Sequence, residues 1–105
     1  MSTRERILEF ASEIVRRYAP EKIILFGSQA RGEANEDSDV DMLLLMEFEG
    51  YGADKGADIL SAINPRLSVD LVVRRPIDVK RRLEQHDQFL REIFRDGIVL
   101  YEAGN

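Results

Sequence analysis

The sequence contains no cysteine and a single histidine, His86, among its 105 residues. The absence of cysteine excludes a disulfide framework, a thiolate metal site and a cysteine nucleophile. A lone histidine just before a predicted helix is more typical of a surface or capping position than of catalysis, so we expect His86 at the surface. No long apolar stretch follows the N-terminus, and we therefore expect neither a signal peptide nor a membrane span. The expected location is cytoplasmic.

The chain is also short of positive charge, because 15 lysines and arginines oppose 20 aspartates and glutamates, for a net charge of −5. This balance argues against a protein whose main task is to grip a long nucleic-acid backbone. It does not exclude a nucleotide, whose charge bound metal can meet. A hydrophobic content of 44% is ordinary for a globular protein. The length predicts that residues 1–105 form a single domain with one core.

The spacing of hydrophobic residues predicts helices and strands in alternation along the chain. A capping box of Ser2 and Glu5 marks the start of the first helix, and the last helix lies between a capping Asp87 and Gly97. Predicted helices cover 3–18, a turn or two within 28–32, a short segment around 59–63, and 76–85; predicted strands cover 22–26, 39–47, 67–73 and 98–101. This order predicts an α+β fold, α/β-like in two layers, with helices packed on a mixed β-sheet.

Polar residues connect several of these elements. We expect Glu33, Glu36 and Asp37 to lie in a solvated loop, and residues 49–53 to form a turn-rich connector. In the last helix we expect a buried stripe of apolar side chains, formed by Phe89, Leu90, Ile93 and Phe94.

Three aspartates interrupt or begin otherwise apolar strands. Asp39 and Asp41 leave the same face of the second strand, because side chains alternate along a strand. Asp70 interrupts the third strand, where a lone carboxylate is costly to bury unless it is exposed or neutralised. If the third strand lies beside the second, the three carboxylates converge into an oxygen-rich site suited to Mg²⁺. Such a site can align a triphosphate, and the third carboxylate can take a proton from an attacking hydroxyl.

Gly27 and Ser28 follow the first strand directly. A glycine lets the backbone approach a phosphate closely, amides at the start of the next short helix point toward an anion, and the Ser28 hydroxyl can donate one more hydrogen bond. Taken alone, such a pair is more often a simple turn and helix cap than a phosphate site. Its occurrence together with the three aspartates favours a phosphate site.

The stretch that holds these residues reads Gly-Ser-Gln-Ala-Arg-Gly over 27–32 and Ser-Asp-Val-Asp-Met over 38–42. It resembles the signature of the minimal nucleotidyltransferases (the MNT proteins) of the DNA polymerase β superfamily: Gly-Ser-x-Ala-Arg-Gly, a loop, then Ser-Asp-x-Asp-Leu. Met42 in place of the usual leucine is the only departure. The resemblance covers nearly the whole chain and implies a polymerase β-type nucleotidyltransferase fold.

The resemblance also implies roles for residues. Asp39, Asp41 and Asp70 would be the catalytic and metal-binding triad, while Gly27 and Ser28 would contact the nucleotide phosphates. The position of Arg31 near the acidic loop, apart from the resemblance, would let it touch a triphosphate or a partner, or equally form a structural ion pair with that loop. Basic residues at 74, 75 and 80–82 form either a solvated helix face or a docking surface.

From these residues we predict a Mg²⁺-dependent nucleotidyltransferase that moves a nucleoside monophosphate, AMP from ATP, onto a hydroxyl group. The chain offers no additional surface for a template or an antibiotic, which favours a protein acceptor over nucleic acid. Proteins of this family commonly pair with a HEPN-domain ribonuclease toxin and act as its antitoxin, so the resemblance implies such a partner. Two alternatives stay open: a non-catalytic antitoxin that acts by occlusion, and a transferase for small molecules such as aminoglycosides.

Overall fold

The computed structural model describes residues 1–35 and 38–104. Its helices and strands follow one another along the chain in the order α1 (Thr3–Tyr18), β1 (Lys22–Phe26), α2 (Ser28–Arg31), β2 (Val40–Leu45), α3 (Gly52–Ile63), β3 (Val69–Arg74), α4 (Pro76–Glu84), α5 (Gln88–Asp96) and β4 (Ile98–Glu102). This sequence of elements confirms the predicted α+β fold.

Local sequence signals set several of these boundaries. The Ser2 side chain accepts a hydrogen bond from the Glu5 backbone N–H, and the Glu5 side chain accepts one from the Ser2 backbone N–H, so the predicted capping box begins α1. The Asp87 carboxylate likewise accepts a hydrogen bond from the Leu90 backbone N–H at 3.0 Å and caps α5. Gly97 follows the last residue of α5, as predicted.

The four strands form one mixed sheet in the order β3-β2-β1-β4. β1 pairs antiparallel with both β2 and β4, whereas β2 and β3 are parallel. The parallel pair is joined by α3, because parallel neighbours need a crossover connection. β2 and β3 therefore begin at the same end of the sheet, which is the end where β1 finishes.

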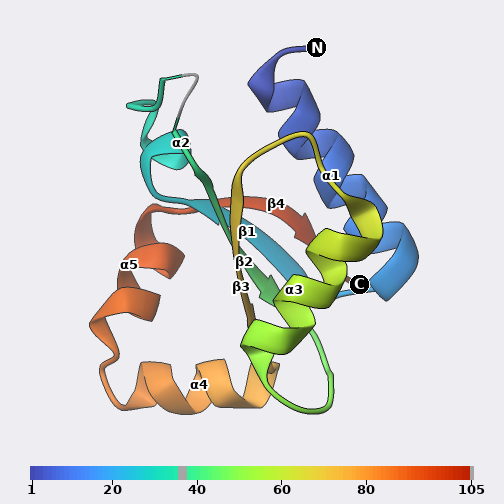
Figure 1. Cartoon of the computed structure of the whole chain (residues 1–105). Helices are drawn as coiled ribbons and strands as arrows, with labels where there is room; N and C mark the ends of the chain where they lie inside the picture. The colour runs from blue at the N-terminus through green and yellow to red at the C-terminus, as the bar shows by residue number, and fades with distance from the viewer. Residues whose placement is uncertain (36–37, 105) are drawn as a thin grey trace.

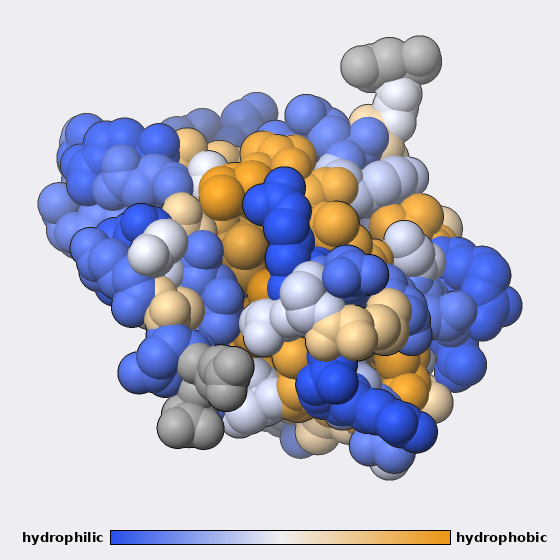
Figure 2. Space-filling view, turned by 90° about the horizontal axis from the view of Figure 1, so that it is seen from above, coloured by the Kyte–Doolittle hydropathy of each residue, from blue (hydrophilic) through white to orange (hydrophobic). Residues whose placement is uncertain are grey.

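Helices cover both faces of this sheet, one layer more than the two expected, with α1 and α3 on one side and α4 and α5 on the other (Figure 1). Side chains alternate along β2, so Met42 and Leu44 pack under α1 and α3, while Leu43 and Leu45 pack under α4 and α5. By the same alternation, Asp41 lies on the α4–α5 face. The face seen from above in Figure 2 shows hydrophobic residues gathered at the centre and mostly hydrophilic residues around them.

The structure corrects two further predictions and tests another in part. Helix α3 is longer than expected and begins at Gly52, inside the predicted connector. The stripe expected on α5 is only half buried, because Leu90 and Ile93 are enclosed whereas Phe89 and Phe94 remain 49% and 37% exposed. In the predicted acidic loop Glu33 is exposed, and Glu36 and Asp37 lie outside the described residues.

Two smaller predictions concern exposure and membranes. His86 is exposed and follows the end of α4 with a φ of 62°, which confirms its predicted surface position. Across the described ranges, no helix combines the length and the hydrophobicity that a bilayer crossing requires.

Candidate active site

The centre of the candidate site is a pair of aspartates on neighbouring strands. In the parallel register of β2 and β3, Asp41 is the partner of Asp70. Partners in register project from the same face of a sheet, so the two side chains stand next to each other on the α4–α5 face. The third strand therefore lies beside the second, which is the condition on which the predicted convergence of the carboxylates depended.

Asp39 comes just before β2 and is held by a residue that the sequence did not single out. The Ser68 hydroxyl donates a hydrogen bond of 2.6 Å to Oδ1 of Asp39. The backbone N–H of Val40 also donates to the Ser68 carbonyl at 2.9 Å, which joins the two segments just ahead of their strands. Ser68 thus fixes the direction of the Asp39 carboxylate. Its only sequence signal is its position two residues before Asp70.

The three carboxylates influence one another. Partial burial raises the pKa of Asp41 above its ordinary value, and the negative charges of Asp70 and Asp39 raise it further. The positive charge of Arg31 opposes this rise. A cation placed among the three carboxylates would relieve the same repulsion.

Gly27 brings the backbone at the end of β1 against these carboxylates. The preceding residue, Phe26, is the register partner of Asp41. Gly27 has φ 74° and ψ −154°, a conformation that side chains disfavour, and a Cβ atom at this position would overlap Oδ2 of Asp41. The backbone conformation therefore favours glycine here, and any larger residue would also displace the Asp41 carboxylate.

Ser28 begins α2, a single helical turn whose first N–H groups have no acceptor within the helix. Arg31, at the end of that turn, forms an ion pair with Glu33, with Nε and Oε2 2.9 Å apart. This is the structural alternative predicted for Arg31. The ion pair is exposed, so it is weak and leaves the guanidinium able to exchange partners.

Mg²⁺, which the fold family implies, prefers carboxylate oxygens, and Asp39, Asp41 and Asp70 supply these from adjoining segments. Burial and then the charges of Asp70 and Asp39 raise the pKa of Asp41, and a cation bound at these oxygens would oppose this rise as Arg31 does. Within the described residues, no group of three or more acidic or histidine side chains has the spacing of a finished metal site. The donor set therefore fits a hard cation in its chemistry, and the side chains must draw together to bind one.

One of the predicted basic residues has a structural role. The Arg75 guanidinium donates to the Phe48 and Gly50 carbonyls at 3.0 and 2.8 Å, and its central carbon lies 4.2 Å from the centroid of the Phe48 ring. Arg75 thereby pins the connector between β2 and α3. It is not free to form a docking surface.

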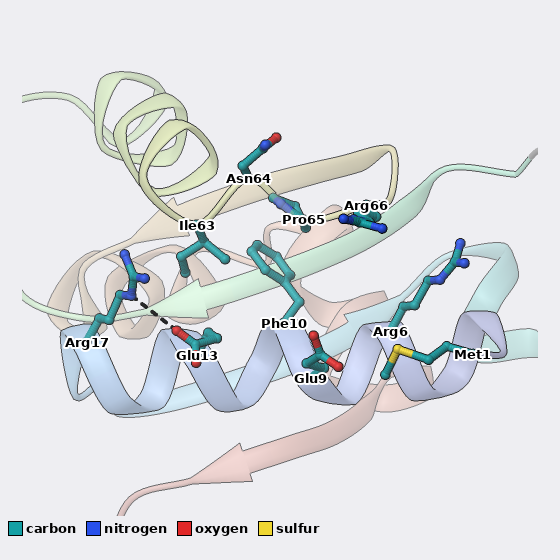
Figure 3. A pocket seen from close by; sticks show the side chains of 10 residues that line it. All are labelled: Met1, Arg6, Glu9, Phe10, Glu13, Arg17, Ile63, Asn64, Pro65 and Arg66. Carbon is teal, nitrogen blue, oxygen red and sulfur yellow. Dashed lines mark hydrogen bonds and ion pairs between the residues drawn. The ribbon is translucent and has the colours of Figure 1, made fainter.

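A cleft lies on the other side of the sheet, away from these carboxylates. It encloses about 560 Å³ between α1 and the segment after α3, and its walls include Phe10, Ile63 and Arg66 (Figure 3). An ion pair between Arg17 and Glu13 crosses one end. Phe10 belongs to the core on the α1–α3 side, so this cleft and Asp41 are on different faces of the sheet. It adds nothing to the site.

Comparison with known proteins places this arrangement in a family. Residues 9–104 match the family described as "Polymerase beta, Nucleotidyltransferase". The chain is 32% identical over 96 residues to "Putative protein adenylyltransferase MJ0141" from Methanocaldococcus jannaschii, covering 90% of this chain and 94% of that protein. A second protein of the same organism, "Putative protein adenylyltransferase MJ0604", is 29% identical over 106 residues, covering 96% of this chain and 100% of the relative.

Solved structures share the fold. A "putative nucleotidyltransferase from Sulfolobus solfataricus" superposes with a TM-score of 0.62 at 21% identity, over 93% of this chain and 78% of that one. A "toxin-antitoxin with AMP-PNP" superposes with a TM-score of 0.57 at 22% identity, over 91% and 73% of the two chains. At these identities the likeness establishes the fold alone.

Proposed function

Since the chain belongs to the polymerase beta nucleotidyltransferase family, we propose that it transfers AMP from ATP to a hydroxyl group of a partner protein. The observation that carries this proposal is the pairing of Asp41 with Asp70 beside Gly27, with Asp39 held alongside by Ser68. In this proposal residues 1–105 act as one nucleotidyltransferase domain.

The proposed roles follow from the positions of the side chains. Asp39 and Asp41 would hold Mg²⁺, which when bound neutralises phosphate charge and aligns the triphosphate. The backbone at Gly27 leaves room for the phosphates, and the N–H groups and hydroxyl at the start of α2 donate hydrogen bonds to them. Arg31 would break its ion pair with Glu33 and contact the triphosphate instead. These groups position the reactants and stabilise the charge of the transition state, and phosphoryl transfer is accelerated almost entirely in these two ways.

The reaction forms one bond and breaks one. The acceptor oxygen bonds to the α-phosphorus, the bond from that phosphorus to the oxygen of the β-phosphate breaks, and pyrophosphate leaves. Asp70 takes the proton of the acceptor hydroxyl. Asp70 is exposed at the start of an edge strand, so a hydroxyl of another protein can approach it.

We propose that the acceptor belongs to a toxin that this chain neutralises as an antitoxin, specifically a HEPN-domain ribonuclease in the cytoplasm. The support is threefold: the sequence resemblance to the MNT proteins, two relatives whose names describe protein adenylylation, and a structural neighbour from a toxin–antitoxin pair. A protein acceptor also suits a site whose third carboxylate is open to solvent.

Radiolabelled ATP tests the proposal. The protein is mixed with Mg²⁺, ATP labelled at either the α- or the γ-phosphate, and a HEPN protein encoded beside it. We expect label from the α-position alone on the HEPN protein, together with an adenylyl mass on one hydroxyl-bearing peptide. The double variant Asp39→Asn, Asp41→Asn should lose the transfer, whereas Asp58→Asn on the exposed side of α3 should keep it.

Other outcomes contradict the proposal in distinguishable ways. Transfer of the γ-label would indicate a kinase. Neutralisation that survives the double variant without a gain in mass would support a binding protein that acts by occlusion. Labelled AMP on an aminoglycoside in place of the protein would indicate a small-molecule transferase.

A further inference from the structure

A small cavity adjoins the candidate site on the side of α5. It encloses about 120 Å³, and the residues that line it include Phe26, Gly27, Arg31, Phe89, Glu92 and Asp96. Phe26 is the register partner of Asp41, so the cavity opens on the same face of the sheet as the carboxylates. Gly27 is shared, because it lines the cavity and also abuts the Asp41 side chain. A ligand with its phosphates at Gly27 therefore has the cavity as its neighbour.

One wall of the cavity is aromatic, and part of the Phe89 ring in this wall stays exposed in the folded protein. Phe89 meets Phe26 edge-on, with ring centroids 5.7 Å apart and planes 86° apart. About half of the Phe89 surface remains exposed, although the pattern of α5 predicts that it is buried. An edge-on contact leaves ring surface available for a flat partner. Base–aromatic stacking is a common way to hold a nucleobase.

The cavity also has a carboxylate that is available as an acceptor. Glu92 and Asp96 are four residues apart on α5 and so lie on one side of the helix. Asp96 is engaged by the Arg95 guanidinium, at 3.0 and 3.1 Å. The Glu92 carboxylate accepts no hydrogen bond from the described residues, and its charge acts on Arg95 without a direct contact. A carboxylate accepts hydrogen bonds and cannot donate them. The Glu92 carboxylate can therefore accept a hydrogen bond from the 6-amino group of adenine. A purine with a carbonyl oxygen at that position offers it no donor there.

Arg31 connects this cavity to the carboxylates. Arg31 lines the cavity and is the last residue of α2, the turn that Gly27 and Ser28 begin. Its side chain therefore belongs both to the cavity wall and to the element that carries the proposed phosphate contacts. A nucleotide with its phosphates at the start of α2 would meet this side chain.

We infer that this cavity is the base-binding subsite, where Phe89 stacks on adenine and Glu92 accepts a hydrogen bond from its 6-amino group. The inference rests on the proposed function, because it takes the triphosphate to lie at Gly27. A volume of 120 Å³ is below the roughly 300–1,000 Å³ of sites for whole drug-sized ligands, so it suits one ring system whose remainder lies over the carboxylates.

Binding measurements with matched ligands separate the base from the phosphates. Isothermal titration compares ATP, purine riboside triphosphate, which lacks only the 6-amino group, and inorganic tripolyphosphate, all with Mg²⁺. For the wild type we expect ATP to bind more tightly than tripolyphosphate, and roughly 10- to 100-fold more tightly than purine riboside triphosphate, as for a hydrogen bond to a charged group.

Variants assign the two contributions. Phe89→Ala should weaken both nucleotides roughly 5- to 100-fold, the range for loss of base stacking, and leave tripolyphosphate unchanged. Glu92→Ala should abolish the preference for ATP over purine riboside triphosphate. Phe94→Ala is the matched control, because Phe94 is a partly exposed phenylalanine of the same helix that does not line this cavity. It should leave all three affinities unchanged.

Three results would overturn the inference. One is equal binding of ATP and tripolyphosphate by the wild type, and another is an unchanged ATP affinity in Phe89→Ala. The third is a preference for the amino group that persists in Glu92→Ala. A loss of tripolyphosphate binding in Phe89→Ala would point to a folding defect, and the Glu92→Ala comparison then decides. None of these measurements depends on AMP transfer. The base-binding subsite can therefore be refuted while the proposed reaction is confirmed, and the proposed reaction can be refuted while the subsite is confirmed.

Discussion

The two faces of the sheet are built differently, although they share the same strands. Among the described residues, 12 buried side chains form the core on the α1–α3 face, whereas 6 form the core on the α4–α5 face. Consecutive residues of β2 show the contrast, because Met42 is fully buried on the first face and Asp41 is partly exposed on the second. The α1–α3 face therefore holds the larger buried cluster, and the α4–α5 face holds the smaller one together with the partly exposed Asp41.

The division lets one strand serve two purposes. A strand that carries charged groups at its start must find packing elsewhere, and alternation gives it a whole face for that purpose. The α1–α3 face supplies most of the buried apolar side chains, and apolar burial is the main driving force of folding. The charge repulsion among the acids is thereby tolerated. We expect changes on the two faces to have separable effects on stability and activity.

The largest expected effect comes from the buried leucines of β2. Leu43 and Leu44 are neighbours, both fully buried, on opposite faces. Leu44→Ala and Leu43→Ala should each lower the free energy of unfolding by about 2–5 kcal/mol, as measured by urea denaturation. Per folded molecule, Leu44→Ala should leave transfer activity unchanged, whereas Leu43→Ala, which shares a face with Asp41, should reduce it. An equal loss of activity in both variants would break the comparison.

The next effect in size is on catalysis alone. Asp41→Asn should lower the rate of AMP transfer about 10²- to 10³-fold, on the scale of losing one preorganised electrostatic group. The fold should persist, because Asp41 forms no part of either buried cluster. Steady-state kinetics and circular dichroism measure the two quantities. A variant that retains more than half of its activity would contradict the proposed role.

Two glycines with positive φ differ both in ψ and in their neighbours. Gly27 has φ 74° and ψ −154°, and a Cβ atom there would meet the Asp41 carboxylate, whereas Gly32 has φ 73° and ψ 19° and a Cβ atom there would meet nothing within 4 Å. Gly32→Ala should cost about 1–2 kcal/mol from backbone strain. Gly27→Ala should cost more in thermal unfolding and should also impair ATP binding. Equal losses of stability, with ATP affinity retained in both variants, would show that the contact at Gly27 is unimportant.

The smallest effect is on the pH dependence of stability. Burial and the charges of Asp70 and Asp39 raise the pKa of Asp41 in the folded protein. Its contribution to stability is therefore fully present below the unfolded value of about 3.9 and is lost as the pH rises through the folded value. Asp41→Asn, measured in chelator, should gain stability relative to the wild type as the pH rises from acid to neutral.

The gain should be below about 1 kcal/mol, because the carboxylate is largely solvated. Thermal melts of both proteins across this pH range measure it, with Asp58→Asn as the control. A difference between Asp41→Asn and wild type that shrinks as the pH rises would have the wrong sign.

The sequence predicted most element boundaries because hydrophobic spacing and caps are local signals. Helix α1 and strand β1 occupy the predicted residues, and Asp87 caps α5 as expected. The early start of α3 was missed because its reason is not local. Gly52 and Gly56 weaken a helix by propensity, yet they allow it to lie against β3, where a Cβ at Gly56 would come within 3.1 Å of the Leu71 carbonyl oxygen.

The residue types of the site could be predicted from the sequence. Its geometry could be predicted only on the condition that the third strand lies beside the second. The pattern of the sequence singled out three aspartates, but their convergence required β3 to lie beside β2, which no local signal dictates. The hydrogen bond from Ser68 to Asp39 depends on the register between two segments 29 residues apart, and so it appears only in the structure. The exposure of Phe89 likewise depends on how α5 sits against Phe26.

Binding of Mn²⁺, used in place of Mg²⁺ for its paramagnetic signal, tests whether the acidic end of the α4–α5 face is a metal–nucleotide site. The titration is followed by electron paramagnetic resonance in the presence of α,β-methylene-ATP, whose α–β linkage resists cleavage. We predict that the wild-type protein binds Mn²⁺ and the nucleotide together and that Asp39→Asn, Asp41→Asn does not. Equal binding by the two proteins, or none by the wild type, would contradict the assignment of this face as the active site.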